Sequence, residues 1–321
     1  MLHGELIRSL DRHIAESRIR HLYLFTGEEG IGKRTVALDM ANKLLCSAEV
    51  SRRPCGVCIG CRTFKARTNV DFIFIEPGGE ESKSGNILIE QSRRIIDEAS
   101  LKPVNSDRKA FVIADAHKLT EQAMNALLKT LEEPPGYLVI ILTCTSKELL
   151  LDTIVSRAFH FSLKAQPDEA IVKILGNVSP VALGYGNGNI GRVKECMKSG
   201  FEETRQKALC LVENIIGRKF GDIEENDFID DLEDMIYLVL NILRDVLIIK
   251  GRSDLIVNAD VMDRLERIAG MVDFKRLDAI IERARRSYEL LRIFTNKRSV
   301  FSNFVYGSQE KTIDRYNWSK I

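Results

Sequence analysis

The feature that most constrains the fold is the run Gly-Glu-Glu-Gly-Ile-Gly-Lys-Arg-Thr at residues 27–35. A short apolar stretch at residues 22–25 precedes it, and residues 36–41, whose composition favours a helix, follow it. A strand, a glycine-rich turn, a lysine and a helix in this order predict a phosphate-binding loop. The glycines let backbone N–H groups surround a phosphate, the helix N-terminus adds the positive end of its dipole, and the lysine adds a full charge.

One position departs from this motif. The residue after the lysine is normally Ser or Thr, whose hydroxyl holds a magnesium ion, and here it is Arg34. Thr35 is a poor substitute, because one residue along a helix rotates the side chain by about 100°. Arg34 could instead contact a phosphate directly. The residues expected to bind nucleotide are Gly27, Gly30, Gly32, Lys33, Arg34 and Thr35.

Length and charge set broad limits. With 321 residues the chain can form two or three domains, each with its own core. The formal net charge is +1, so the overall charge neither suggests nor excludes nucleic acid. The first residues lack the pattern of a signal peptide, and the most apolar segment, residues 235–249, contains an asparagine, an arginine and an aspartate. We therefore expect a cytoplasmic protein with no membrane partner.

Predicted strands alternate with predicted helices through residue 163. The strands are residues 22–25, 72–75, 110–114, 138–142 and 159–161. Because several of them are apolar throughout, we predict an α/β fold whose parallel sheet is covered on both faces. Residues 164–200 are expected to form a small helical lid. From residue 201 to 321 apolar side chains recur at helical spacing, which predicts an all-α domain packed as a bundle.

Four cysteines crowd into a short insertion, residues 46–61. Cys46, Cys55, Cys58 and Cys61 are separated by gaps of eight, two and two residues, which lets their sulfurs converge on one ion. Soft thiolate ligands favour zinc. A disulfide fits a reducing compartment poorly, and an iron–sulfur cluster lacks other signs of redox chemistry. Four protein ligands leave no position for water, so we expect a structural zinc ion that fixes an insertion without its own core.

Several motifs together resemble one family. The run Asn-Ala-Leu-Leu-Lys-Thr-Leu-Glu-Glu-Pro-Pro at residues 125–135, the cysteine spacing, and Ser156-Arg157 before the fifth strand are similar to bacterial AAA+ clamp-loader subunits of DNA polymerase III. The resemblance covers the whole chain. It implies an AAA+ base at residues 1–163, a lid, and a helical collar that also serves oligomerisation. It also implies gamma/tau and delta subunits, the sliding clamp and primed DNA as partners.

Within this family the choice lies between the gamma/tau motor type and the delta-prime type. The motor type carries an Asp-Glu pair after the third strand, where this chain has Ala114 and Asp115. With the register shifted by one, Asp115 is the metal-holding acid and Ala116 replaces the base. A carboxylate is missing in either register. Loss of base catalysis alone costs about 10²–10⁴ in rate, so we expect little or no independent ATP hydrolysis. ATP or ADP binding stays open, because Lys33 and the glycines remain.

Arg157 is the residue expected to carry chemistry in a neighbour. In similar clamp loaders a Ser-Arg-Cys arginine reaches the γ-phosphate bound by the next subunit, and such a finger contributes about 10³–10⁵ in rate. Here Ala158 replaces the cysteine. The alternative is a surface arginine in a local salt bridge. Thr145 and Arg192 are candidate sensors, although Arg192 falls one residue late, with Gly191 at the expected position.

The sequence therefore predicts a delta-prime-like clamp-loader subunit. The nearest alternative is a gamma/tau-type ATPase with unusual motor residues. A stand-alone nucleotide kinase or signalling NTPase would share the loop, but the zinc spacing and the long helical C-terminus argue against it. A purely structural DNA-binding protein gains little support from a net charge of +1.

Overall fold

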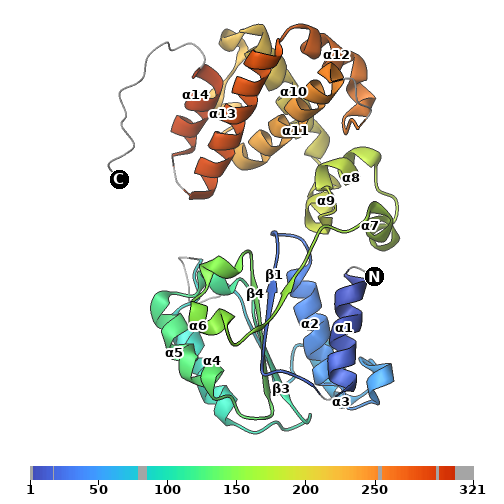
Figure 1. The fold of residues 1–321 in the computed structure, drawn as a ribbon, viewed down its shortest axis with the longest axis vertical. Helices are drawn as coiled ribbons and strands as arrows, with labels where there is room; N and C mark the ends of the chain where they lie inside the picture. Colours follow the sequence, from blue (N-terminus) through green and yellow to red (C-terminus); the bar gives the residue numbers. More distant parts are fainter. Residues whose placement is uncertain (1–2, 17, 79–84, 252–254, 294–295, 308–321) are drawn as a thin grey trace. The chain divides into compact units, whose positions relative to one another are not determined.

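The structure is a computed structural model that describes residues 3–16, 18–78, 85–251, 255–293 and 296–307. The chain divides into two compact units (Figure 1). The first comprises residues 1–176 and 188–191, and the second comprises residues 177–187 and 192–321. The division into base, lid and collar stays a prediction.

A five-stranded parallel sheet in the order β2-β3-β4-β1-β5 forms the first unit. Its strands are β1 (Leu22–Thr26), β2 (Phe72–Ile75), β3 (Lys109–Ile113), β4 (Leu138–Cys144) and β5 (Phe159–Ser162). Parallel pairing requires helical crossovers, and these alternate with the strands along the chain. The predicted parallel P-loop sheet is confirmed.

Helices cover both faces of this sheet (Figure 1). Tyr23 and Phe25 of β1 face a core formed with α1 and α2, while Leu22 and Leu24 face a core formed with α4, α5 and α6. This alternation follows from the two-residue period of a strand. The elements of the first unit besides its strands are α1 (Gly4–Ala15), α2 (Lys33–Leu44), η1 (Val50–Arg52), α3 (Ile59–Lys65), α4 (Ile89–Ser100), η2 (Ala116–Lys118), α5 (Glu121–Glu132), η3 (Lys147–Leu149), α6 (Asp152–Val155) and α7 (Asp168–Leu175).

The second unit is helical, as predicted for the C-terminal part of the chain. Its central helix is α11, which packs against α10, α12 and α13. The apolar side chains that recur at helical spacing along α11, including Met235, Val239 and Ile242, are buried in this core. The elements that begin after residue 176 are α8 (Pro180–Gly186), α9 (Ile190–Cys196), α10 (Phe201–Gly217), η4 (Phe220–Asp222), η5 (Glu225–Asp227), α11 (Leu232–Lys250), η6 (Ala259–Val261), α12 (Met262–Gly270), α13 (Phe274–Ile293) and α14 (Lys297–Tyr306).

A buried polar network ties α10 to the segment that follows α11. The Arg205 guanidinium is almost fully buried and contacts the carboxylates of Glu202 and Asp260 and the side-chain oxygen of Asn258. Asn258 in turn donates to the buried carboxylate of Asp245. Buried charge is tolerated here because each member has a partner. Among the described residues, no helix combines the length and the apolar character that a membrane span needs.

Candidate nucleotide site and cysteine cluster

The glycine-rich loop runs from the end of β1 to the start of α2. Gly27, Gly30 and Gly32 all have positive φ angles, at 146°, 79° and 107°. At Gly27 a Cβ atom would lie 2.7 Å from the carbonyl oxygen of Leu163, so a side chain has no room there. Gly32 is the residue before α2 and adopts the left-handed conformation. The glycines thus form the turn that leads into α2. The first N–H groups of this helix have no partner within the helix and can donate to a phosphate at its N-terminus.

Lys33 lies within the loop. Its Nζ donates to the carbonyl oxygens of Gly27 at 2.8 Å and Glu28 at 2.7 Å, and the residue is only 6% exposed. Burial lowers the pKa of this ammonium group, and the negative charge of Asp115 counteracts part of that effect. Lys33 therefore lies at the position of a P-loop lysine. It stabilises the loop by donating to the carbonyl oxygens of Gly27 and Glu28.

Three residues far away in the sequence hold the same loop. The His3 ring Nε2 lies 2.8 Å from the Ile31 oxygen, Asn189 Nδ2 donates to the Glu29 oxygen at 2.8 Å, and the Gly191 N–H donates to the Gly30 oxygen at 3.0 Å. Together with the two bonds from Lys33, these contacts give every carbonyl of residues 27–31 a partner. Sequence reasoning missed His3 and Asn189, because nothing in the local pattern connects them to the loop.

Gly191 lies directly against the phosphate loop. A Cβ atom on residue 191 would lie 2.5 Å from the Gly30 Cα, so the backbones of these two residues meet directly. The candidate sensor Arg192 belongs to the second unit, where its guanidinium lies over the Tyr237 ring at 4.9 Å.

Arg34 extends toward β2. Its guanidinium donates to Glu76 Oε2 at 2.6 Å and lies 4.4 Å from the centre of the Phe74 ring. The pair is half exposed at both ends. The residue that replaces the magnesium-binding hydroxyl is therefore engaged with a carboxylate and an aromatic ring of the same unit.

One carboxylate follows β3. Asp115 adopts a left-handed conformation with φ 49°, and its N–H donates to Thr143 Oγ1 at 3.0 Å. Its neighbours Ala114 and Ala116 are buried. In the first register buried Ala114 replaces the first member of the acidic pair, and in the shifted register buried Ala116 replaces the second. Thr145, the other sensor candidate, contacts the loop through its carbonyl oxygen, which accepts from the Gly27 N–H at 3.3 Å.

Arg157 lies just after α6 and is 39% exposed. Its guanidinium donates to the Thr153 oxygen at 2.8 Å and pairs with Glu132 Oε1 at 3.3 Å. Glu132 is itself 44% exposed and ends α5. In this single chain the arginine thus has a local partner, yet solvent reaches its head group.

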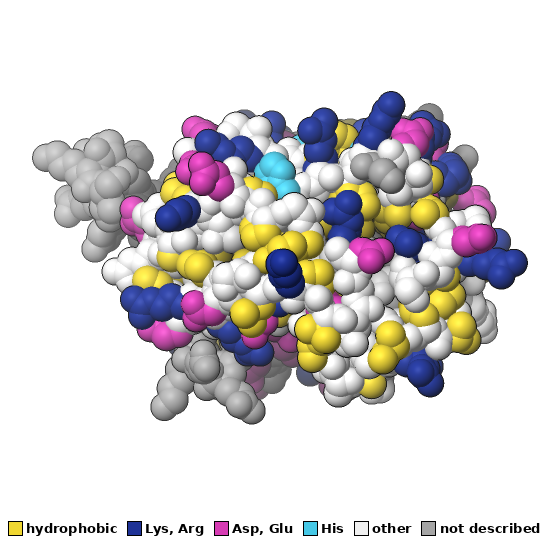
Figure 2. Space-filling model, turned by 90° about the horizontal axis from the view of Figure 1, so that it is seen from below, with side chains coloured by type: hydrophobic (Ala, Val, Ile, Leu, Met, Phe, Trp, Pro, Cys, Tyr) yellow, Lys and Arg dark blue, Asp and Glu magenta, His cyan; other side chains and the backbone are white. Residues whose placement is uncertain are grey.

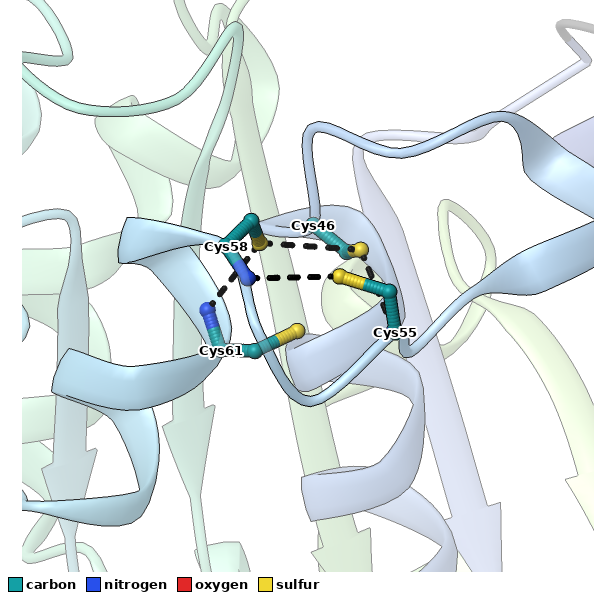
Figure 3. Close-up of side chains that lie close together, drawn as sticks. All are labelled: Cys46, Cys55, Cys58 and Cys61. Atoms are coloured by element: carbon teal, nitrogen blue, oxygen red, sulfur yellow. Dashed lines mark hydrogen bonds between the residues drawn. The ribbon is translucent and has the colours of Figure 1, made fainter.

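The four cysteines of the insertion converge (Figure 3). Their sulfur atoms all lie within 4.8 Å of one another, and those of Cys46 and Cys58 are 3.8 Å apart. A tetrahedral zinc ion with bonds of about 2.3 Å to sulfur requires edges of about 3.8 Å, so the donor set fits zinc. The same atoms form no disulfide.

Backbone N–H groups support these sulfurs. The amides of Cys55, Cys58 and Cys61 donate to the sulfurs of Cys46, Cys55 and Cys58, each at 3.4 Å. Burial raises the pKa of Cys58, but hydrogen bonds from Cys61 and Ser47 outweigh it and bring that pKa to about 6. Burial raises the pKa of Cys61. The hydrogen bonds prepare the cluster for a cation, because they stabilise thiolates.

Surface charge is mixed. Figure 2 shows Lys and Arg side chains interspersed with Asp and Glu side chains and with hydrophobic patches. No single-sign field covers the face shown there, in agreement with a net charge of +1.

Comparisons with known proteins give the family. A model described as "DNA polymerase III, delta subunit" matches residues 2–167, which is more than half of the 321 residues. The chain belongs to the DNA polymerase III delta-subunit family. A second model of this family, for the C-terminal part of the delta subunit, matches residues 226–300. The resemblance to clamp-loader subunits is thereby confirmed.

The chain is also similar in sequence to tau and gamma subunits of DNA polymerase III. The Haemophilus influenzae DNA polymerase III subunit tau/gamma is 28% identical over 236 residues, 71% of this chain and 33% of that protein. The Escherichia coli tau subunit is 35% identical over 166 residues, 52% of this chain and 25% of that protein. The chain thus spans a third or less of the length of these relatives.

Among solved structures, a gamma subunit-related protein of DNA polymerase III from Thermotoga maritima matches 93% of this chain and 97% of its own, with 18% identity and a TM-score of 0.49.

Proposed function

We propose that this chain is a delta-prime-like subunit of the bacterial DNA polymerase III clamp loader, acting in the cytoplasm. In this role it assembles with gamma/tau and delta subunits and helps ATP-driven loading of the sliding clamp on primed DNA. It hydrolyses ATP poorly by itself and presents Arg157 to the nucleotide of a neighbouring subunit.

The observation that carries this proposal is the position of Arg34. ATP hydrolysis needs a magnesium ion that bridges phosphate oxygens and a carboxylate that orients the attacking water. The residue after Lys33 has no hydroxyl, and its guanidinium is paired with Glu76. After β3, Asp115 stands between two buried alanines. Both groups that would handle the metal and the water are incomplete.

Nucleotide binding is a separate matter from hydrolysis. The loop keeps its three glycines in left-handed or related conformations, and Lys33 remains at its base. ATP or ADP would be held by Lys33 and the first N–H groups of α2, and would supply phosphate charge at that helix end. We propose that this loop binds ATP or ADP but does not hydrolyse ATP efficiently.

The cysteine cluster is proposed to hold one structural zinc ion. Cys46, Cys55, Cys58 and Cys61 would supply all four ligands, and the ion would fix the insertion against α2. Four protein ligands leave no open position for catalysis, so the ion would act on stability.

The decisive experiment is reconstitution with gamma/tau and delta subunits, the sliding clamp and primed DNA. Arg157→Ala should lower the DNA- and clamp-stimulated ATPase by about 10³ or more at the site that the arginine serves. Arg18→Ala is the matched control, because Arg18 also forms an exposed ion pair, with Glu16. An unchanged ATPase in the Arg157 variant would refute a finger in trans.

The second candidate is a gamma/tau-type ATPase, which the tau and gamma relatives favour. It predicts magnesium-dependent hydrolysis by the purified chain that disappears in Lys33→Ala. The delta-prime proposal predicts that the original chain and its Lys33→Ala variant, each assayed alone, show no measurable difference in ATP hydrolysis. Nucleotide binding, measured by calorimetry, should still weaken in the variant.

A further inference from the structure

A groove of about 670 Å³ lies beside the cysteine insertion in the first unit. Residues from the insertion and α3 form one wall, Arg34, Leu38 and Asn42 along α2 form another, and β2 lies along the groove. Arg34 and Cys61 are among its lining residues, so the groove borders both the phosphate loop and the cysteine cluster. The loop glycines, Lys33 and Arg157 are not part of its lining.

The groove follows the outer edge of β2. This strand ends the sheet, and among the described residues it pairs only with β3. Ile73 and Phe74 both line the groove, although consecutive side chains of a strand point to opposite faces. A groove that touches both must run along the strand edge.

Backbone groups are available on that edge. The Ala110 and Ala114 amides donate to the oxygens of Asp71 and Ile75, so these residues face β3. Because the direction of backbone groups alternates along a strand, the N–H and C=O of Phe74 face the opposite edge. An edge of this kind can pair with another chain.

The groove combines aromatic side chains with positive charge. Phe64, Phe72 and Phe74 line it and are half-buried, and the rings of Phe64 and Phe72 lie 4.6 Å apart. The charged residues of the lining are Arg34, Lys65, Arg67, Arg94 and Glu76. Arg34 and Glu76 neutralise each other, whereas the other three cations are exposed and have no ion pair with a described residue. A ligand with negative charge suits this balance.

An unpaired acceptor in the groove points to a ligand with N–H groups. Asn42 contributes to the lining, and its Oδ1 is buried without a hydrogen-bond partner among the described residues. A buried acceptor left unpaired costs stability, and a peptide N–H would satisfy it. A phosphodiester, which offers only acceptors at neutral pH, would not.

We propose that this groove binds an acidic peptide segment of a partner protein, which adds to the free edge of β2 as an extended strand. Main-chain hydrogen bonds to Phe74 give the docking its direction, the phenylalanines take apolar side chains from one face of the segment, and Lys65, Arg67 and Arg94 pair with its carboxylates. Strand addition and arginine or lysine recognition of acidic groups are established modes of peptide binding.

The test uses the full chain and a fluorescein-labelled peptide of alternating aspartate and valine, seven residues long, followed by fluorescence anisotropy. A peptide of alternating lysine and valine and a labelled oligothymidylate serve as comparisons. The acidic peptide should bind with an affinity that falls as salt is raised, and the lysine peptide should not bind.

Lys65→Glu combined with Arg94→Glu should weaken binding of the acidic peptide at least about tenfold. The matched control is Lys164→Glu with Lys173→Glu, which makes the same charge change at exposed positions of the same unit outside the groove. All four side chains are exposed, so folding should be unaffected. Equal weakening by both double variants would show non-specific charge attraction and overturn the proposal.

Amide hydrogen exchange provides the structural test. The bound acidic peptide should slow exchange at the Phe74 amide, which faces the free edge, more than at Ile73, which faces β3. Tighter binding of the oligothymidylate, lost in the Lys65 and Arg94 double variant, would instead identify a nucleic-acid groove. Failure of the acidic peptide to bind would also overturn the proposal.

Discussion

The cysteine cluster and the phosphate loop are both predicted from short motifs, but they differ in where their other contributing residues lie in the sequence. All four donors of the cluster lie within residues 46–61, and the fold brings their sulfurs within 4.8 Å. The loop depends on His3, Asn189 and Gly191 as well as on its own residues. Both motifs are predictable from sequence, but only the cluster's partners are, because the loop takes its supporting groups from distant segments.

The cluster and the loop also differ in which functional groups they contain. The cluster has every ligand that a zinc site needs. The loop has its shape, because the glycines and Lys33 remain, but Arg34 and the alanines beside Asp115 stand where metal and water chemistry would be expected. The loop therefore keeps the conformation of a phosphate-binding loop without the groups for hydrolysis, whereas the cluster has both the conformation and all four ligands.

The largest effect is expected at the cluster. Cys58→Ser should lower the zinc-to-protein ratio from about one to near zero, because structural zinc contributes about 10–16 kcal/mol in zinc-finger peptides and needs all its ligands. Elemental analysis and exchange of the insertion's amides would measure this. Cys210→Ser is the control, since Cys210 is exposed and lies in the second unit. A variant that retains one zinc ion per chain would contradict the assignment.

A smaller effect is expected where the loop meets Gly191. Gly191→Ala puts a Cβ atom 2.5 Å from the Gly30 Cα, and overpacking of this kind costs about 1–3 kcal/mol in the free energy of unfolding. Gly136→Ala is the matched control, because its Cβ atom would meet nothing within 4 Å. Urea unfolding of the two variants measures the difference. Equal stability would mean that the loop and residue 191 move apart readily.

The stability of the first unit is expected to depend on pH. Burial lowers the pKa of four histidines of the first unit below 6.5, namely His3, His21, His117 and His160. The unfolded chain then binds more protons than the folded one as pH falls below about 6.5, so the stability of this unit is complete above that value and declines toward the folded pKa values. The second unit contains no histidine.

Amide hydrogen exchange at pH 7.5 and 5.5, corrected for intrinsic rates, measures this. Opening of β1 and β4 should become easier at the lower pH, while opening of α11 stays constant. A uniform response of both units would show that the histidines do not govern it.

The smallest effect is expected at the ion pair of Arg157. Glu132→Ala should change the free energy of unfolding by less than about 1 kcal/mol, because both partners are substantially exposed. If Arg157 acts in trans, the reconstituted ATPase should stay within about twofold of the original. Glu133→Ala is the neighbouring control. A large loss of ATPase in the Glu132 variant alone would mean that this pair positions the arginine.

Much of the fold followed from the sequence. The five strands lie where the apolar runs predicted them, with ends shifted by a residue or two. The apolar side chains that recur at helical spacing along α11 are buried in the bundle because residues three and four apart share one face of a helix. The partner of Arg34 could not be predicted, since Glu76 lies 42 residues away and nothing in the spacing connects the two.

The sequence by itself determined the parallel sheet, the phosphate loop and the four sulfur donors, because each rests on spacing along a single segment. The tertiary structure decided which groups surround the loop, which carboxylate pairs with Arg157, and that the edge of β2 meets the cysteine insertion in a basic groove. Those contacts join segments separated by tens of residues or more. Only the packing of strands and helices brings such segments within hydrogen-bond distance.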